Sequence, residues 1–136
     1  MTVCVDASLV VKFLTLEDNT DKALTWLDIH GADRMVAPTF LAGEVAAAIR
    51  QKERRGVFSV EKGNDVLSAF MALNVELVWD YDLLKRALEM AVELNEPTVY
   101  DTLYLAVAER HHCDYWTADA RFARAAASPY PFVRLL

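Results

Sequence analysis

Short apolar runs with β-like patterns alternate with longer helical patterns along the whole chain. The predicted strands are Thr2–Val5, Met35–Ala37, Val75–Trp79, Tyr115–Thr117 and Phe132–Leu135. The predicted helices are Ser8–Leu14, Asp18–His30, Thr39–Arg55, Ser59–Leu73, Asp82–Leu94, Thr98–His112 and Asp119–Ala126. Strands that are separated by helices form βαβ units, so we expect an α/β fold, a three-layer α/β/α sandwich with a mainly parallel central sheet.

The 136 residues are most simply one domain, 1–136, because no repeat, low-complexity tract or linker divides them. The formal net charge is −6. A protein that binds nucleic acid by bulk attraction is usually basic, so nucleic-acid chemistry here requires local basic groups and bound metal. A basic protein partner fits the charge at least as well.

The cysteines and the N-terminus bear on location. Cys4 and Cys113 form no C-x-x-C pair and no disulfide framework. The N-terminus lacks the pattern of a signal peptide, since Asp6 interrupts its apolar run, and no run approaches the length of a membrane span. We therefore expect a cytoplasmic protein that makes no contact with a membrane.

Four acidic residues stand at the ends of the apolar segments: Asp6, Glu44, Asp101 and Asp119. Asp6 and Asp119 follow predicted strands, whereas Glu44 and Asp101 lie near the starts of predicted helices. In a parallel sheet, strand carboxyl ends and neighbouring helix N-termini line one crevice. Carboxylates that converge there repel one another and resist ionisation unless a cation joins them. The spacing therefore predicts a site for Mg²⁺ or Mn²⁺, which take oxygen ligands.

Each acid also has a structural explanation. Asp6 and Asp119 can be helix N-caps, Asp101 can form a capping box with Thr98, and Glu44 can be a solvated acid on a helix. Taken together, the shared site is the better interpretation, because Glu44 borders an apolar stripe and Asp101 shares a helix face with apolar residues.

Carboxylates that turn toward a core need polar partners. Ser8 and Thr117 lie two residues from Asp6 and Asp119, and we predict that their hydroxyls hold these acids.

Four segments resemble, in order, the sequence blocks of the PIN-domain family: Val5–Lys12, Pro38–Val45, Tyr100–Ala108 and Thr117–Phe122. The compact length is similar to VapC-type toxins of toxin–antitoxin pairs. The resemblance implies a metal-dependent endoribonuclease that hydrolyses RNA phosphodiester bonds, is often a homodimer and is held inactive by a cognate antitoxin protein. One departure is that the family often has Asn a few residues after the Glu, where this chain has alanines, Ala46 to Ala48.

Roles follow from the proposed hydrolysis. Asp6 and Asp101 are predicted as direct metal ligands, with Glu44 and Asp119 binding directly or through water. Asp119 is also a candidate acceptor for the proton of the attacking water.

Basic residues lie in two kinds of place. We predict that three of them meet the RNA backbone: Lys12, Arg121 and Arg124. Four others crowd a predicted helix end, where favourable placement of cations is the simpler reading: Arg50, Lys52, Arg54 and Arg55.

Other hypotheses remain open at this point. They are a PIN nuclease for RNA processing without a toxic role, a non-catalytic protein- or RNA-binding module on the same scaffold, and a phosphoacceptor receiver that gathers acids around Mg²⁺. His111, His112 and Cys113 look like a metal cluster, but adjacent residues on a helix point in different directions.

Overall fold

A computed structural model of the chain describes residues 1–15 and 20–136. In this part of the chain five strands form one sheet in the order β3-β2-β1-β4-β5, and every neighbouring pair is parallel. The strands are β1 (Thr2–Val5), β2 (Arg34–Pro38), β3 (Glu76–Val78), β4 (Asp114–Thr117) and β5 (Val133–Leu135). The predicted parallel sheet is confirmed.

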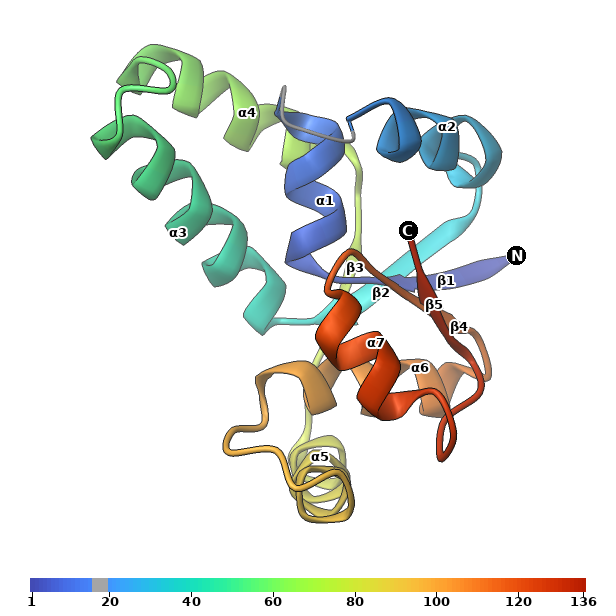
Figure 1. Cartoon of the computed structure of the whole chain (residues 1–136). Helices are drawn as coiled ribbons and strands as arrows, with labels where there is room; N and C mark the ends of the chain where they lie inside the picture. Colours follow the sequence, from blue (N-terminus) through green and yellow to red (C-terminus); the bar gives the residue numbers. More distant parts are fainter. Residues whose placement is uncertain (16–19) are drawn as a thin grey trace.

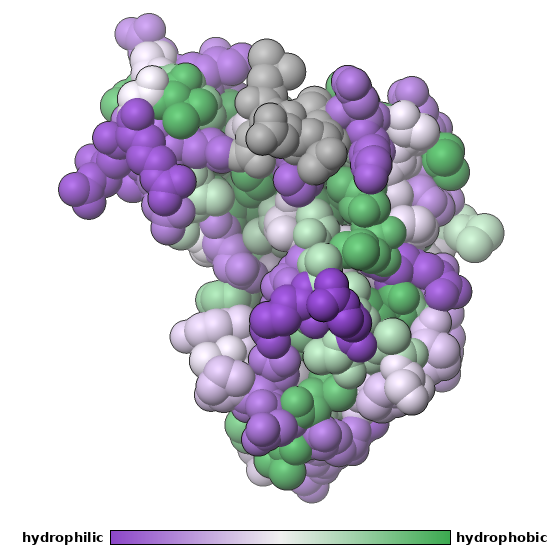
Figure 2. Space-filling model, in the orientation of Figure 1, coloured by the Kyte–Doolittle hydropathy of each residue, from purple (hydrophilic) through white to green (hydrophobic). Residues whose placement is uncertain are grey.

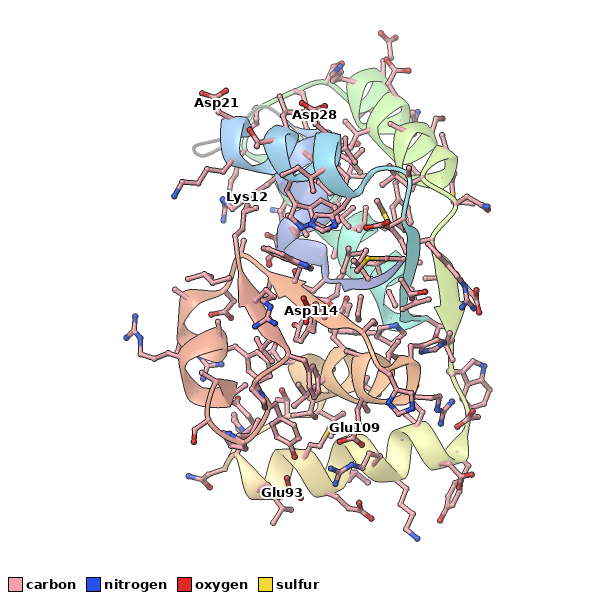
Figure 3. All side chains as sticks on the ribbon, turned by 90° about the vertical axis from the view of Figure 1, so that its right-hand side faces the viewer. Lys12, Asp21, Asp28, Glu93, Glu109 and Asp114 are labelled. Atoms are coloured by element: carbon pink, nitrogen blue, oxygen red, sulfur yellow. The ribbon has the colours of Figure 1, made fainter. Side chains whose placement is uncertain are left out.

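Helices cover both faces of the sheet (Figure 1). On one face lie α1 (Ala7–Leu14), α2 (Thr20–His30), α3 (Phe40–Arg54) and α4 (Val60–Ala72), and on the other lie α5 (Tyr81–Glu93), α6 (Tyr100–His111) and α7 (Ala120–Ala126). Figure 3, turned by 90°, shows the same two helical layers with the sheet between them. The predicted three-layer sandwich is therefore confirmed. The predicted start of the second helix, Asp18 and Asn19, lies outside the described residues.

The core lies where β1 and α6 meet. Val3, Cys4 and Val5 are buried on both faces of the sheet, as is typical of a central parallel strand. Helix α6 contacts β1, β2 and β4 on one side and α5 on the other, so residues 102–108 are all buried. The hydroxyl of Thr102 within this run donates to the carbonyl of Ala87 at 2.8 Å, which satisfies a polar group in the core.

The starts of the helices differ in whether a side chain caps them. Ser59 caps α4 by accepting a hydrogen bond from the backbone N–H of Lys62 at 3.1 Å. Thr39 makes no side-chain cap at the start of α3. The alternative explanation of Asp101, a capping box with Thr98, does not hold, because α6 begins one residue later than the box requires, with Val99 in the N-cap position. Asp101 therefore stands in the first turn of α6 without serving a cap.

The strand order places a crevice beside the central strand. From β1 the chain first builds β2 and β3 on one side and then returns to build β4 and β5 on the other. Open α/β sheets bind ligands outside the carboxyl ends of the strands at such a reversal. Helices α1 and α3 begin near this edge, left of centre in Figure 1. None of the described helices combines the length and apolar character that crossing a membrane requires.

Candidate active site

Asp6 ends β1 and caps α1, and its side chain is only 5% exposed. Its Oδ1 atom accepts hydrogen bonds from the Ser8 hydroxyl at 2.6 Å and the Leu9 N–H at 3.0 Å. Its Oδ2 atom accepts one from the Tyr115 hydroxyl at 3.0 Å. Burial raises the pKa of Asp6, and the hydrogen bonds, including one from Thr117, oppose that shift. Asp6 is thus both a helix cap and a carboxylate at the crevice.

Asp119 occupies the equivalent place after β4, where its Oδ1 atom accepts the N–H of Phe122 at 3.0 Å and caps α7. The predicted hydroxyl groups hold the two strand ends together. Thr117 Oγ1 accepts the backbone N–H of Asp119 at 3.0 Å, and Ser8 Oγ accepts that of Ala118 at 2.9 Å. These hydrogen bonds, one of which joins α1 to the end of β4, therefore fix the crevice between β1 and β4.

Glu44 comes to the site from α3 and is partly buried. The Tyr104 hydroxyl, on α6, donates to its Oε1 atom at 2.5 Å and so connects the two helical layers. Burial raises the pKa of Glu44, the negative charges of Asp6 and Asp101 raise it further, and the bond from Tyr104 opposes the shift. Tyr104 also stacks on Tyr115, with ring centroids 5.8 Å apart. These tyrosines were not identified from the sequence.

Asp101 stands in the first turn of α6 and is the acid whose pKa is raised most clearly. Burial raises its pKa to about 6, with further contributions from the charges of Asp119, Asp6 and Glu96. The charges of Asp119 and Asp6 raise the pKa of Asp101, and those of Asp6 and Asp101 raise the pKa of Glu44. The four predicted acids therefore lie within electrostatic reach of one another. The structure thus brings the predicted set together at the carboxyl edge of the sheet.

A fifth acid, Glu96, holds a cation at this site. Its side chain is 7% exposed and accepts the Arg121 guanidinium at 3.0 Å, while a second nitrogen of Arg121 lies 3.7 Å from Asp101 Oδ2. Arg121 is 65% exposed, so it lies at the mouth of the site. Glu96 was not identified from the sequence, because an acid before Pro97 in a turn reads as a solvated residue.

The other two predicted RNA contacts lie on either side of the acids. Lys12 on α1 lines a hollow that also includes Ser8 and Glu44. Arg124 is exposed on α7, one turn beyond Arg121.

The donor set fits a hard cation held partly by water. Within residues 1–15 and 20–136, no three acidic, histidine or cysteine side chains are close enough together to bind one ion directly. Mg²⁺ is usually held by one or two carboxylates and keeps several waters, so it suits acids that are near one another without enclosing a cage. Burial is the main cause of the raised pKa values of Asp6, Glu44 and Asp101, and a bound cation would favour the ionised form of each.

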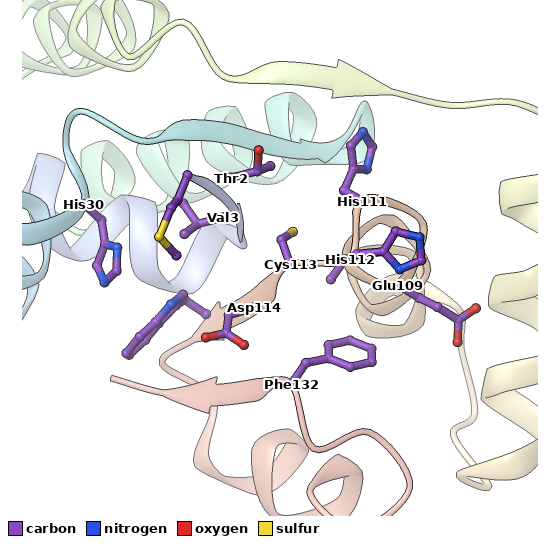
Figure 4. Close-up of a pocket in the computed structure, with 12 residues that line it drawn as sticks. Thr2, Val3, His30, Glu109, His111, His112, Cys113, Asp114 and Phe132 are labelled. Carbon is purple, nitrogen blue, oxygen red and sulfur yellow. The ribbon is translucent and has the colours of Figure 1, made fainter.

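The histidine and cysteine run lies elsewhere, at a hollow of about 530 Å³ at the amino end of the sheet (Figure 4). His111 and His112 and the Cys113 thiol point in different directions there, as their adjacency predicts. His111 Nδ1 lies 2.9 Å from the carbonyl oxygen of Val107, and His112 ends α6 with a φ of 49°.

The sequence model of the PIN domain matches residues 3–128, a span that includes all four acids. The chain belongs to the PIN-domain family. Two curated relatives are a VapC ribonuclease from Mycobacterium bovis and ribonuclease VapC9 from Mycobacterium tuberculosis. Each is 28% identical over 121 residues, which cover 89% of this chain and 88% of the relative.

A solved structure shows the same PIN fold. It is VapBC2 from Rickettsia felis bound to a DNA fragment from their promoter, with a TM-score of 0.69 and 14% sequence identity. The match covers 100% of this chain and 98% of the other. The family match and this likeness agree with the parallel sandwich described above.

Proposed function

We propose that this PIN-domain protein is a metal-dependent endoribonuclease that hydrolyses RNA phosphodiester bonds and is the toxin of a toxin–antitoxin pair. The observation that carries the proposal is the convergence of Asp6, Glu44, Asp101 and Asp119, three of them with raised pKa values, at the carboxyl edge of a parallel sheet. The relatives named VapC ribonuclease support the activity, and the likeness to a VapBC2 structure supports an antitoxin partner. A homodimer remains a prediction from the family resemblance.

Each acid has a role in the proposed reaction. When bound, Mg²⁺ or Mn²⁺ polarises a phosphoryl oxygen and lowers the pKa of a bound water. Asp6 and Asp101 are proposed to hold the ion, with Glu44 contributing through water. A hydrogen bond from the Phe122 N–H holds Asp119 beside the other acids. We propose that Asp119 accepts the proton of the attacking water.

Arg121 complements these acids at the mouth of the site. Its ion pair with Glu96 keeps a guanidinium near Asp101, where it offsets part of the negative field that a phosphate must enter. A guanidinium also suits the non-bridging oxygens of a phosphodiester, because its planar donors match that geometry.

The test is cleavage of a total RNA pool mapped by end sequencing. The wild type and Asp101→Asn are compared in Mg²⁺, in Mn²⁺ and in EDTA. We expect discrete cuts that require both the metal and Asp101. Cuts in EDTA, or cuts that survive Asp101→Asn, contradict the proposed site. No cuts from folded protein that is free of inhibitor favour the non-catalytic binding module.

The toxin role is tested separately from the chemistry. Expression of the wild type is expected to arrest growth, and expression of Asp101→Asn is not. Co-expression of the product of a small adjacent gene is expected to restore growth. Cleavage in vitro without growth arrest instead favours an RNA-processing nuclease.

A further inference from the structure

A groove of about 510 Å³ runs between α1 and α3 on one side of the acids. At one end it is lined by Ser8 and Glu44, which belong to the proposed site. At the other end it is lined by Lys12 from α1 and by Lys52 and Arg55 from the end of α3. The distance along α3 from Glu44 to Arg55 is about 16 Å at the rise of an α-helix, which is room for a few nucleotides.

The three cations form a local cluster in a protein whose net charge is −6. Burial lowers the pKa of Lys52, and the positive charges of Arg55 and Lys12 lower it further, so the three groups are near enough to repel one another. Like charges that gather at an open groove favour a polyanion, because each phosphate relieves the repulsion between its neighbours. Strongly hydrophilic residues cover this end of α3 in Figure 2.

The middle of the groove is lined by small side chains. Ala7, Val11, Ala47 and Ala48 line it, together with one longer polar side chain, Gln51. Protein interfaces usually depend on aromatic or other large anchors that fill pockets, and this groove offers none among its lining residues. A sugar–phosphate backbone needs only charge and clearance, and phosphate contacts position a strand without reading its bases. The alanines that stand where the family often has Asn therefore keep this path open.

We infer that the α1–α3 groove binds the phosphodiester backbone of single-stranded RNA beside the scissile bond, with Lys12, Lys52 and Arg55 contacting its phosphates. The inference rests on the proposed ribonuclease function and extends it to Lys52 and Arg55, which the sequence presented only as cations at a helix end. The proposed contacts in this hollow of about 510 Å³ are to phosphates, which carry no sequence information. Base recognition is therefore assigned to other parts of the surface.

The helix end supplies its own control. Arg54 lies between Lys52 and Arg55 in sequence, is exposed, and does not line the groove. Arg54→Gln removes the same charge from the same helix end as Arg55→Gln. If the effect is general electrostatics, both substitutions weaken RNA binding alike. If the groove binds RNA, only Arg55→Gln weakens it.

The experiment measures binding apart from cleavage. A fluorescent, unstructured oligoribonucleotide is titrated in EDTA with Asp101→Asn protein, and anisotropy is followed over a range of salt concentrations. Introducing Lys52→Gln and Arg55→Gln together into this Asp101→Asn protein is expected to weaken RNA binding by about tenfold at low salt. The slope of log affinity against log salt is expected to fall by about 1.4, since each lost phosphate contact contributes about 0.7 for single strands. Arg54→Gln is expected to leave both values unchanged.

Three further arms make the outcome decisive. Lys52→Arg, which keeps the charge, is expected to bind like the parent, so loss of binding there indicates damage to the fold and a thermal melt identifies it. A fully paired duplex of equal length is expected to bind more weakly than the single strand. Equal loss for Arg54→Gln and Arg55→Gln overturns the groove, and so does groove-dependent binding of polyglutamate in place of RNA.

Failure of the groove and failure of the function are distinguishable. If the wild type cleaves RNA and the doubly substituted protein binds and cleaves as the parent does, the groove is wrong and the ribonuclease stands. If the wild type cleaves nothing but binds RNA in a manner that requires Lys52 and Arg55, the groove stands and the ribonuclease is wrong.

Discussion

The two ends of the parallel sheet differ in how their charged groups are satisfied. At the amino end, the groups around the hollow have local partners: Asp114 accepts Arg134 at 3.1 Å, and His30 lies 2.9 Å from Asp33. At the carboxyl end, burial raises the pKa values of Asp6, Glu44 and Asp101, and the negative charge of Asp6 adds to the rise at Glu44 and Asp101. Both ends have open space, so a hollow does not by itself indicate chemistry. Buried acids with raised pKa values that gather in one place are the stronger indication.

Strand β4 offers the sharpest test of this contrast, because an aspartate stands at each end of it. Asp119→Asn is expected to reduce RNA cleavage at least about a hundredfold, since it removes a proposed general base. Asparagine caps helices as well as aspartate does, so the fold is expected to persist. Asp114→Asn, at the amino end in Figure 3, is the matched control and is expected to stay within about twofold of the parent. Equal losses of cleavage activity in the two variants, measured as initial rates, contradict the contrast between the two ends of the sheet.

Stability as a function of pH tests the raised pKa of Asp101 directly. The pKa of Asp101 rises from 3.8 to about 6 on folding. The folded state therefore holds its proton more tightly, and the protein loses stability as pH rises from about 4 through 6. In EDTA at pH 8, Asp101→Asn is expected to exceed the parent by about 1 kcal/mol in free energy of unfolding. This value discounts the full shift, because 34% of the side chain is exposed.

The gain from Asp101→Asn is expected to vanish below pH 4, where Asp101 is protonated in both states. Mg²⁺ is expected to stabilise the parent more than the variant. Urea denaturation at several pH values measures both effects. A variant less stable than the parent at pH 8 contradicts the account of Asp101.

Glu96 and Arg121 are expected to move the acidic limb of the cleavage rate in opposite directions. The charge of Arg121 lowers the pKa of Asp101, so Arg121→Gln shifts the limb to higher pH. The charge of Glu96 raises that pKa, so Glu96→Gln shifts the limb to lower pH. We expect changes of less than about tenfold in rate at pH 6, because the pair is exposed to solvent at Arg121. Shifts in the same direction indicate that the pair acts only on the fold.

The smallest expected effect is at the amino end. His112 ends α6 in the left-handed region, with a φ of 49°, which favours glycine. His112→Gly is expected to raise the free energy of unfolding by about 0.5 kcal/mol, because relief of strain is partly offset by a more flexible unfolded chain. Cleavage is expected not to change. A loss of cleavage in this variant assigns the hollow a part in the chemistry.

The sequence predicted the sheet and the four acids because both leave local signals. A buried parallel strand reads as an apolar run, and the predicted Thr2–Val5 is the observed β1. Asp6 and Asp119 were recognisable because each follows such a run. The capping box, the alternative explanation of Asp101, could be excluded only from the structure, because local patterns do not locate the start of α6 to a single residue.

The missing parts of the site are contacts between distant positions. Tyr104 and Glu44 are 60 positions apart, and Arg121 and Glu96 are 25 apart, so no periodicity connects them. Lys52 and Arg55 were recognised from the sequence as cations at a helix end. Their place in a groove was not predicted, because the groove forms only where α1 packs beside α3. Lys12, Arg121 and Arg124 remain predictions as RNA contacts.

The position of β1 in the sheet also sets the order in which activity can arise. Asp6 accepts its bond from Tyr115 across 109 positions, and β1 needs β4 beside it to complete the crevice. Contacts so distant along the chain form late, because closing a long loop is entropically unfavourable. A ribosome finishes Asp6, Glu44 and Asp101 before it has added β4 and Asp119. We therefore expect nascent chains and truncated products that lack β4 to be inert, because the crevice that positions Asp6 beside Asp119 is not yet built.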